Sequence, residues 1–381
     1  MNLRKTVLQI RYRDDGLRVT CNQYLDAFPI GAFYRVVVYL TGSAPAHETM
    51  AIDVDETISL ELSRRQLKGF RLDARCRLRK LIENYEPSLI LAHRWKATAI
   101  AVAALSLAPK KKIPVFSVVH ALYQLGSWSR RLAGRFMLKG RCRFIGVSEA
   151  VRQDILAAGF GLKPEDVLAL PNAIDVVQTE KSLMESQAAR HLLGLDSKVL
   201  VCGHVGRMVG AKDQKTLISA FAKLRQRLPA VHLVMVGEGR LESDLRSQVK
   251  SLELDDAVTF AGAQSQAVRL MPAFDLFVLT SVAEGFPRVL LEAMVCRLPI
   301  VATNSGGVRE IFADDVKLCR AGAVEEISAA LEQCLKLDGA ARQNLGEIGY
   351  RRVLENFSSE VFRRRLLSFV GQNGLLRETV R

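Results

Sequence analysis

Two glutamates stand eight residues apart in the stretch SVAEGFPRVLLEAM, at Glu284 and Glu292. On one unbroken helix they would lie a little over two turns apart, on roughly the same side. Gly285 and Pro287 oppose such a helix, because glycine is conformationally permissive and proline keeps the residue before it out of the α region. Proline also suits the first position of a new helix. We therefore expect Glu284 in a loop and Glu292 inside the helix that follows.

The start of that helix offers a place for an anion. Helix N-termini carry free N–H groups and favour negative charge, and here these groups belong to Arg288, Val289 and Leu290. Glu284 and Glu292 flank this end, and carboxylates accept hydrogen bonds from the hydroxyl groups of a sugar or a ribose. The pattern therefore predicts a ligand that combines hydroxyl groups with an anion.

Two cations follow a predicted strand in the same half of the chain. After the strand at 198–205 comes GRMVGAKD, in which Arg207 and Lys212 leave the strand end together. This is not a P-loop, because three residues separate the glycines and Asp213 follows the lysine. The planar fork of arginine and the point charge of lysine suit a diphosphate. Since ligands of open parallel sheets bind beyond the carboxyl ends of the strands, we expect cations and glutamates to share one nucleotide-sugar site.

Small residues follow the neighbouring predicted strands. Gly206 opens the loop with the two cations, Gly237 follows the strand at 231–236, and Gly262 and Ala263 follow the next one. Glycine allows the backbone to approach a ligand closely. We expect these positions to border the nucleotide, with a slot for a flat base that adenine, guanine and uracil would all satisfy.

Short aliphatic or β-branched segments alternate with helical ones, which is typical of α/β proteins with parallel sheets. A chain of 381 residues suggests two domains. We expect two open sheets of similar size, joined near 172–196. The predicted strands are 6–10, 34–40, 88–92, 114–120, 143–147, 198–205, 231–236, 258–261, 276–279 and 300–303. The predicted helices are 60–84, 95–107, 148–158, 214–227, 240–252 and a terminal one within 350–370.

Composition indicates a globular protein with an acidic partner. Apolar residues make up 49%, and seven scattered cysteines without a CxxC pair fit a reducing cytoplasm. No signal peptide is predicted, and no apolar run approaches the roughly 20 residues that span a bilayer. The net charge is +14, and residues 1–180 hold 27 basic against 17 acidic side chains. Charge alone leaves phosphates, nucleic acid and an anionic membrane surface open.

Several motifs of the chain resemble those of a known enzyme family. GRMVGAKD, GEGRLESDL, VTFAG and EGFPRVLLEAM resemble the retaining glycosyltransferases of family four, which have the GT-B fold of two Rossmann-like domains facing each other across a cleft. SVVHALY, GVSEAVRQDI and LPNAIDV in the first half agree more loosely. The resemblance implies an N-terminal acceptor-binding domain over 1–175, a nucleotide-sugar-binding domain over 176–357, and a helix at 358–381 that packs back on the first domain.

The resemblance also implies roles for single residues. Arg207 and Lys212 would neutralise the diphosphate and stabilise the leaving group. Glu284 would hold the donor sugar, His120 would contact it near the reacting carbon, and Glu292 would hold the ribose. Phe286 and Pro287 would shape the sugar pocket, and Gly16 would lie beside the phosphates. These enzymes retain the anomeric configuration and usually need no metal, so we expect neither a metal nor another cofactor.

The acceptor and the location are read from basic segments. Two of these, 64–79 and 128–144, could rest on an anionic membrane surface. A phosphorylated acceptor could be gripped by Arg94, Trp95 and Lys96. The pair Asp53 and Asp55 matches a DxD metal motif, but it lies far from the predicted cleft, and we expect no metal there.

The sequence thus predicts a cytoplasmic glycosyltransferase, peripheral on the inner face of the membrane. Its donor would be a UDP-, GDP- or ADP-linked sugar, and its acceptor an anionic, lipid-linked glycan such as lipopolysaccharide core; nucleic acid is not expected as a partner. The alternative is a non-catalytic basic protein that binds membrane or nucleic acid and keeps a glycosyltransferase-like shell.

Overall fold

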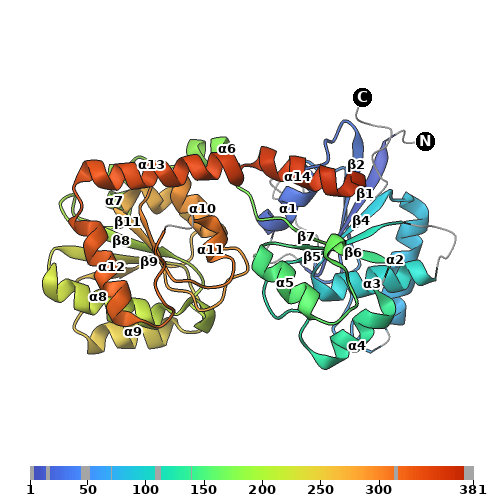
Figure 1. The fold of residues 1–381 in the computed structure, drawn as a ribbon, viewed down its shortest axis with the longest axis horizontal. Coiled ribbons are helices and arrows are strands. Elements are labelled where there is room, and N and C mark those ends of the chain that lie inside the picture. Colours follow the sequence, from blue (N-terminus) through green and yellow to red (C-terminus); the bar gives the residue numbers. More distant parts are fainter. Residues whose placement is uncertain are drawn as a thin grey trace. The chain divides into compact units, whose positions relative to one another are not determined.

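The computed structural model of the chain describes residues 4–13, 18–43, 52–69, 71–107, 113–138, 140–312 and 316–372. The chain divides into two compact units. The first unit contains residues 1–172 and 360–381, and the second contains residues 173–359. Figure 1 shows a parallel sheet with helices around it in each unit.

The first unit is built on a seven-stranded sheet in the order β3-β2-β1-β4-β5-β6-β7, and every neighbouring pair is parallel. The strands are β1 Lys5–Arg11, β2 Phe33–Tyr39, β3 Glu56–Ser59, β4 Leu89–His93, β5 Val115–Val119, β6 Cys142–Gly146 and β7 Val167–Ala169. The helices are α1 Arg18–Asp26, α2 Leu72–Tyr85, α3 Arg94–Ser106, α4 Trp128–Met137, α5 Glu149–Ala157 and α14 Ser359–Gln372. Continuous apolar strands suit a parallel sheet that is covered on both faces, and β4 and β5 are buried along their whole length.

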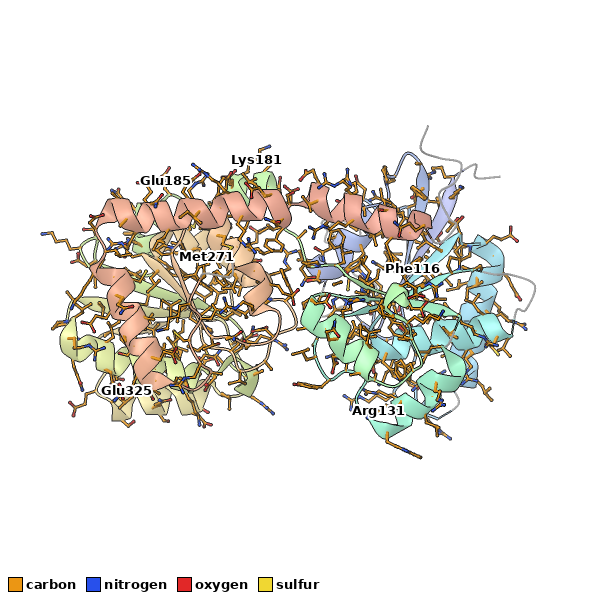
Figure 2. The ribbon with its side chains drawn as sticks, viewed as in Figure 1. Phe116, Arg131, Lys181, Glu185, Met271 and Glu325 are labelled. Atoms are coloured by element: carbon orange, nitrogen blue, oxygen red, sulfur yellow. The ribbon has the colours of Figure 1, made fainter. Side chains whose placement is uncertain are left out.

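The last helix, α14, packs on the first unit (Figure 1). Phe362 lies edge-on against Tyr24 of α1, with ring centroids 5.0 Å apart. Phe369 lies edge-on against Phe116 of β5 at 5.8 Å, and Figure 2 shows Phe116 in the interior of this unit. The apolar spacing of the C-terminal segment is therefore used to cover a sheet that was formed by residues far earlier in the chain.

The second unit contains a five-stranded parallel sheet in the order β10-β9-β8-β11-β12. Its strands are β8 Leu200–Val205, β9 Val231–Val236, β10 Val258–Phe260, β11 Leu276–Leu279 and β12 Ile300–Ala302. Its helices are α6 Val176–Ser182, α7 Ser186–Leu192, α8 Gln214–Arg227, α9 Glu242–Ser251, α10 Arg288–Val295, α11 Val308–Ile311, α12 Val324–Lys336 and α13 Gly339–Asn356. The two places where the chain enters and leaves this unit lie together, because the N–H of Ile174 donates to the carbonyl of Phe357 at 3.0 Å.

The predicted α/β class with two Rossmann-like sheets is confirmed. One predicted helix, at 60–84, was wrong over its first part, since α2 begins at Leu72. Glu61 and Arg71 have positive φ angles of 47° and 53°, which break a right-handed helix. The elements α1, β3 and β7 of the first unit and α6, α7, α11 and α12 of the second were not predicted. The terminal helix predicted within 350–370 was wrong as one element, since α13 ends at Asn356 and α14 begins at Ser359.

Two further features bear on the sequence predictions. The carboxylate of Asp55 accepts hydrogen bonds from the guanidinium of Arg4 at 2.7 Å and from the backbone N–H of Arg35 at 2.8 Å. This carboxylate of the DxD pair therefore links the residue before β1 to the first half of β2.

Among the helices that the structure describes, none has the length and apolar character needed to cross a membrane.

Candidate functional site

One of the two predicted cations, Lys212, lies beside the first predicted glutamate, Glu284, in the second unit. Nζ of Lys212 lies 2.5 Å from Oε1 of Glu284, and the two side chains are only 18% and 11% exposed. The hydroxyl of Ser281 donates to the same carboxylate oxygen at 2.6 Å. Two residues separated by 72 positions are thus joined at the carboxyl ends of β8 and β11. This is the edge of an open parallel sheet at which ligands bind.

Hydrogen bonds to the backbone fix the loop that carries Lys212. The hydroxyl of Thr280 donates to the carbonyls of Lys212 and Asp213, both at 3.1 Å. The N–H of Val282 donates to the carbonyl of Ala211 at 2.9 Å. Asp213 then takes a left-handed conformation, φ 48°, directly before α8. The ammonium group is therefore held by a loop that is tied to the neighbouring strand end.

A buried histidine supports the other cation. Nδ1 of His204 lies 2.9 Å from the carbonyl of Val278, and its Nε2 faces the Gln214 amide at 3.3 Å. That amide donates to the carbonyl of Arg207 at 2.9 Å. Burial lowers the pKa of His204 to about 4, so the ring is neutral at pH 7. The backbone of Arg207 is anchored in this way while its side chain is exposed at the strand end.

The glycines serve first to bring three loops together. A Cβ at Gly237 would lie 2.2 Å from the carbonyl oxygen of Gly206, and one at Gly239 would lie 2.4 Å from that of Met208. The N–H of Gly237 donates to the carbonyl of Gly262 at 2.8 Å. Close backbone contact between the loops after β8 and β9 explains Gly237 and Gly239 without a ligand, whereas Gly262 has a positive φ of 66° and open space at its Cβ position. Their predicted contact with a nucleotide, and that of Ala263, stays a prediction.

The second predicted glutamate lies inside α10, as expected. The helix begins at Arg288, and Pro287 occupies the position before it rather than the first helical position. Nη2 of Arg288 lies 3.8 Å from Oε1 of Glu292, and its Nη1 donates to the carbonyl of Ala173 at 3.1 Å. Burial raises the pKa of Glu292, and the Arg288 charge opposes that rise.

The segment before α10 is packed rather than open. Gly285 is buried, and Phe286 is 5% exposed, with its ring centroid 5.5 Å from that of Phe357. Val289 and Leu290 continue the first turn of α10, where the N–H of Leu290 donates to the carbonyl of Pro287 at 3.1 Å. The anion-binding role predicted for this turn remains a prediction.

Two serines of this strand edge were missed by the sequence reasoning. Ser281 holds Glu284 as described, and Ser305 follows β12 with a buried hydroxyl that lacks a partner among the described residues. The loop after β12 also supplies the N–H of Gly307, which donates to the carbonyl of Glu284 at 3.2 Å. A short polar residue two positions after the end of a predicted strand was the available signal for both serines.

The remaining predicted site residues belong to the first unit. His120 follows β5 and forms a hydrogen bond with His93 at 2.9 Å. Trp95 packs against Phe160, with ring centroids 6.0 Å apart, and Nζ of Lys96 lies 4.6 Å from the ring centroid of Tyr12. Arg94 begins α3 with φ 70°. Gly16 lies outside the described residues.

Comparisons with known proteins identify the family of the chain. The family described as "Glycosyl transferases group 1" matches residues 185–352, and the one described as "Glycosyltransferase Family 4" matches residues 31–178. The chain is 32% identical over 202 residues to an N-acetyl-alpha-D-glucosaminyl L-malate synthase of Bacillus anthracis, covering 52% of each chain. It is 32% identical over 161 residues to a Campylobacter jejuni 4-alpha-N-acetylgalactosaminyltransferase whose name includes a diphospho-undecaprenol, covering 42% of this chain and 41% of that one. The alignments thus span about half the length of these relatives.

Similarity to a solved structure extends over the whole fold. A crystal structure of the Anabaena protein HepE in complex with UDP superposes with a TM-score of 0.80 at 22% identity, covering 97% of this chain and 100% of that one. At this level of identity the likeness establishes the fold. The two family matches together account for most of the sequence, and the chain belongs to the family-four glycosyltransferases with the GT-B fold.

Proposed function

We propose that the protein transfers a sugar from a nucleotide diphosphate sugar, with retention of anomeric configuration and without a metal ion. The observation that carries this proposal is the Lys212–Glu284 pair at the carboxyl ends of β8 and β11, with exposed Arg207 at the end of β8. Two cations can neutralise the charge that develops on a leaving diphosphate, which is the electrostatic task that a metal performs in other enzymes.

The roles of the acceptor groups follow from their places. Glu284 accepts hydrogen bonds from hydroxyl groups of the donor sugar, and Glu292 accepts them from the hydroxyl groups of the ribose. The first turn of α10 lies between these two glutamates in the chain and contributes N–H groups toward the phosphates. His120 of the first unit contacts the sugar. We propose UDP as the first nucleotide to test, because the HepE structure contains it, with GDP and ADP as the alternatives.

We further propose an anionic, lipid-linked glycan as the acceptor, of which a lipopolysaccharide core is one example. Burial, and after it the guanidinium groups of Arg75 and Arg130, lowers the pKa of Arg71. The charges of Arg75 in α2 and Arg130 in α4 therefore repel that of Arg71, and an anion bound beside Arg71 would reduce this repulsion. The Campylobacter jejuni relative is named for a diphospho-undecaprenol substrate, which has the same chemistry.

A membrane surface fits the exposed residues around α4. Trp128 is 78% exposed, Tyr123 76% and Leu132 47%. Arg131, labelled in Figure 2, is exposed on the same helix. Aromatic and aliphatic side chains among arginines are the pattern of a helix that rests in an anionic lipid interface. We therefore propose a location at the inner face of the cytoplasmic membrane.

The test is a donor screen. The purified chain is incubated with UDP-, GDP- and ADP-linked sugars and lipid-extracted acceptors, and release of nucleoside diphosphate is measured in the presence of a chelator. Transfer that persists with the chelator, and a product anomer equal to that of the donor, support the proposal. A protein that binds anionic vesicles but gains no thermal stability from any nucleoside diphosphate would instead be a non-catalytic binding protein.

A further inference from the structure

A buried chain of hydrogen bonds crosses four neighbouring strands of the first unit. It runs from Tyr39 at the end of β2, through Arg11 and Gln9 of β1, to His93 at the end of β4 and His120 after β5. The strands β2, β1, β4 and β5 are consecutive in the sheet. All of these groups except Gln9 stand at or beyond the last residue of a strand, so the chain of bonds lies toward the carboxyl edge of the sheet.

The direction of this chain is fixed at Arg11, because a guanidinium group only donates. Nε and Nη2 of Arg11 lie 2.9 and 2.5 Å from Oε1 of Gln9, so this atom is the amide oxygen. The amide nitrogen of Gln9 faces the carbonyl of Cys21 at 2.8 Å, and a carbonyl only accepts. The contacts of the amide oxygen and of the amide nitrogen therefore indicate the same orientation of the Gln9 amide. The second proton of the amide points along the 2.8 Å contact to Nε2 of His93.

This direction sets the tautomer of both imidazoles. Nε2 of His93 accepts from Gln9, and burial holds the pKa of His93 well below its usual value, so its one proton is on Nδ1. That proton is donated across 2.9 Å to Nε2 of His120. Burial also lowers the pKa of His120 to about 3. The neutral ring of His120 consequently carries its proton on Nδ1, which is buried and has no hydrogen-bond partner among the described residues.

We propose that Gln9 and His93 are positioning residues, which present His120 as a neutral imidazole with its proton on Nδ1 and make it a hydrogen-bond donor toward an oxygen of the bound sugar. That the oxygen belongs to a sugar rests on the function proposed above. An imidazole that presents N–H in this direction cannot remove a proton from the substrate there. His120 thus orients the substrate or stabilises charge on an oxygen, and it does not act as a base.

The rings are supported from one side by Tyr24. Its ring lies edge-on to His93 at 5.4 Å and to His120 at 6.4 Å between centroids. The same ring contacts Phe362 of α14 at 5.0 Å. The C-terminal helix is therefore part of the packing that holds the two imidazoles in place.

A competing use of the same residues is a metal site. Ligand atoms of Cys21, His93 and His120 lie within 4.8 Å of one another. The hydrogen bonds already occupy both nitrogens of His93 and Nε2 of His120, so a metal could enter only by displacing this chain of bonds. The two readings therefore predict opposite responses to zinc.

The first experiment needs no substrate. Long-range ¹H–¹⁵N spectra of the full chain with ¹⁵N-labelled histidine report the tautomer of each of its six histidines. Signals are assigned with His120→Asn and His93→Asn. We expect protonated Nδ1 and bare Nε2 for both residues at pH 7, unchanged by one equivalent of zinc. A proton on Nε2 of His120, a charged ring, or loss of these signals with zinc would overturn the proposal.

The second experiment reverses the chain by one isosteric change. In Gln9→Glu the carboxylate still pairs with Arg11 but only accepts, so His93 must donate to it from Nε2 and accept from His120 on Nδ1. We expect Nδ1 of His120 to lose its proton and kcat/KM for the donor to fall about tenfold to a hundredfold. Gln153→Glu, the same change on the surface of α5, is the control and should alter neither.

The outcomes separate the two proposals. If Gln9→Glu inverts the tautomer and transfer is unaffected, the assigned role of His120 is wrong. If Gln9→Glu does not fold, the wild-type spectra still decide the tautomer. If no donor supports transfer by the wild-type protein, the proposed function fails, while the spectra alone judge the hydrogen-bond chain.

Discussion

Replacing Lys212 with alanine should remove most transfer activity while the second unit stays folded. The ammonium group lies 2.5 Å from Glu284 and is anchored through the loop that Thr280 and Val282 hold. No described residue offers a second ammonium group at this carboxylate. The substitution therefore removes one cation from the site and leaves the backbone bonds of the loop in place.

The effect on stability is bounded by the environment of Glu284. Removing one partner of a fully buried ion pair costs about 3–5 kcal/mol, because a buried charge is left alone. Glu284 keeps the Ser281 hydrogen bond at 2.6 Å and is 11% exposed, so the cost should be below that range. A domain stable by about 5–15 kcal/mol remains folded after such a loss. The double variant Lys212→Ala with Glu284→Gln should recover part of it.

The effect on function should be larger. A hydrogen bond to a charged group contributes about 1.5–3 kcal/mol, which corresponds to roughly 10- to 150-fold weaker binding of a nucleoside diphosphate. Turnover should fall further, by about 10²–10³, because negative charge grows on the leaving phosphate in the transition state. Calorimetric titration with UDP measures the first quantity, and nucleotide release from the donor measures the second.

Lys215→Ala provides the matched control. Lys215 lies three residues away on α8, is 57% exposed and approaches Asp244 only to 3.9 Å. It should retain wild-type binding and turnover, and the urea midpoint should hardly change. Near-normal turnover of Lys212→Ala, or an equal loss in Lys215→Ala, would refute the role of this strand edge in binding the diphosphate.

Three further outcomes follow from the same unit. Gly237→Ala should lower the unfolding free energy by about 2 kcal/mol or more, because its Cβ would lie 2.2 Å from a backbone oxygen at φ 135°, whereas Gly210→Ala meets nothing within 4 Å; urea titration compares them. Burial lowers the pKa of His204 to about 4, so its contribution to stability is complete above the unfolded pKa near 6.5 and is lost as pH falls toward 4. His204→Gln should remove one proton, about 1.4 kcal/mol per pH unit, from the slope measured between pH 6 and 4. Arg207→Ala should weaken UDP binding and its salt dependence without shifting the thermal midpoint, since the side chain is exposed.

Sequence periodicity located the strands of the second unit and the helices α8 and α9, whereas α6, α7, α11 and α12 were not predicted. The bounds predicted for α8 and β9 equal those observed, since apolar residues at helical spacing and a continuous aliphatic strand leave little choice. The division of the chain after Asn172 lies three residues before the boundary expected from the resemblance. The fold class and the strand ends could thus be predicted from the sequence, because buried positions are occupied by apolar residues.

Contacts between strand ends were less accessible. Gln9, Arg11 and His93 are 84 residues apart at the extremes, and only the order β2-β1-β4-β5 makes them neighbours. Nothing local distinguishes Gln9 from a surface glutamine, although it is fully buried. Gly237 was predicted to border the nucleotide, which stays a prediction, and the structure adds that a Cβ at this position would lie against the carbonyl of Gly206. Sequence patterns indicate which segments are buried, while polar networks depend on the topology that follows.

The Lys212–Glu284 pair has a further consequence for how a donor binds. A diphosphate that draws Lys212 away leaves the Glu284 carboxylate with only the Ser281 hydroxyl as a partner among the described side chains, and this loss offsets part of the gain from the phosphate. A sugar hydroxyl that donates to Glu284 restores the missing hydrogen bond, so sugar and diphosphate should favour each other's binding. We expect the affinity gained by adding the sugar to UDP to shrink about tenfold in Glu284→Gln, whose amide does not lose an ion pair. Titrations of UDP and the UDP-sugar into both proteins measure this difference. An unchanged ratio would mean that the carboxylate and the diphosphate act independently, and that the ion pair is only structural.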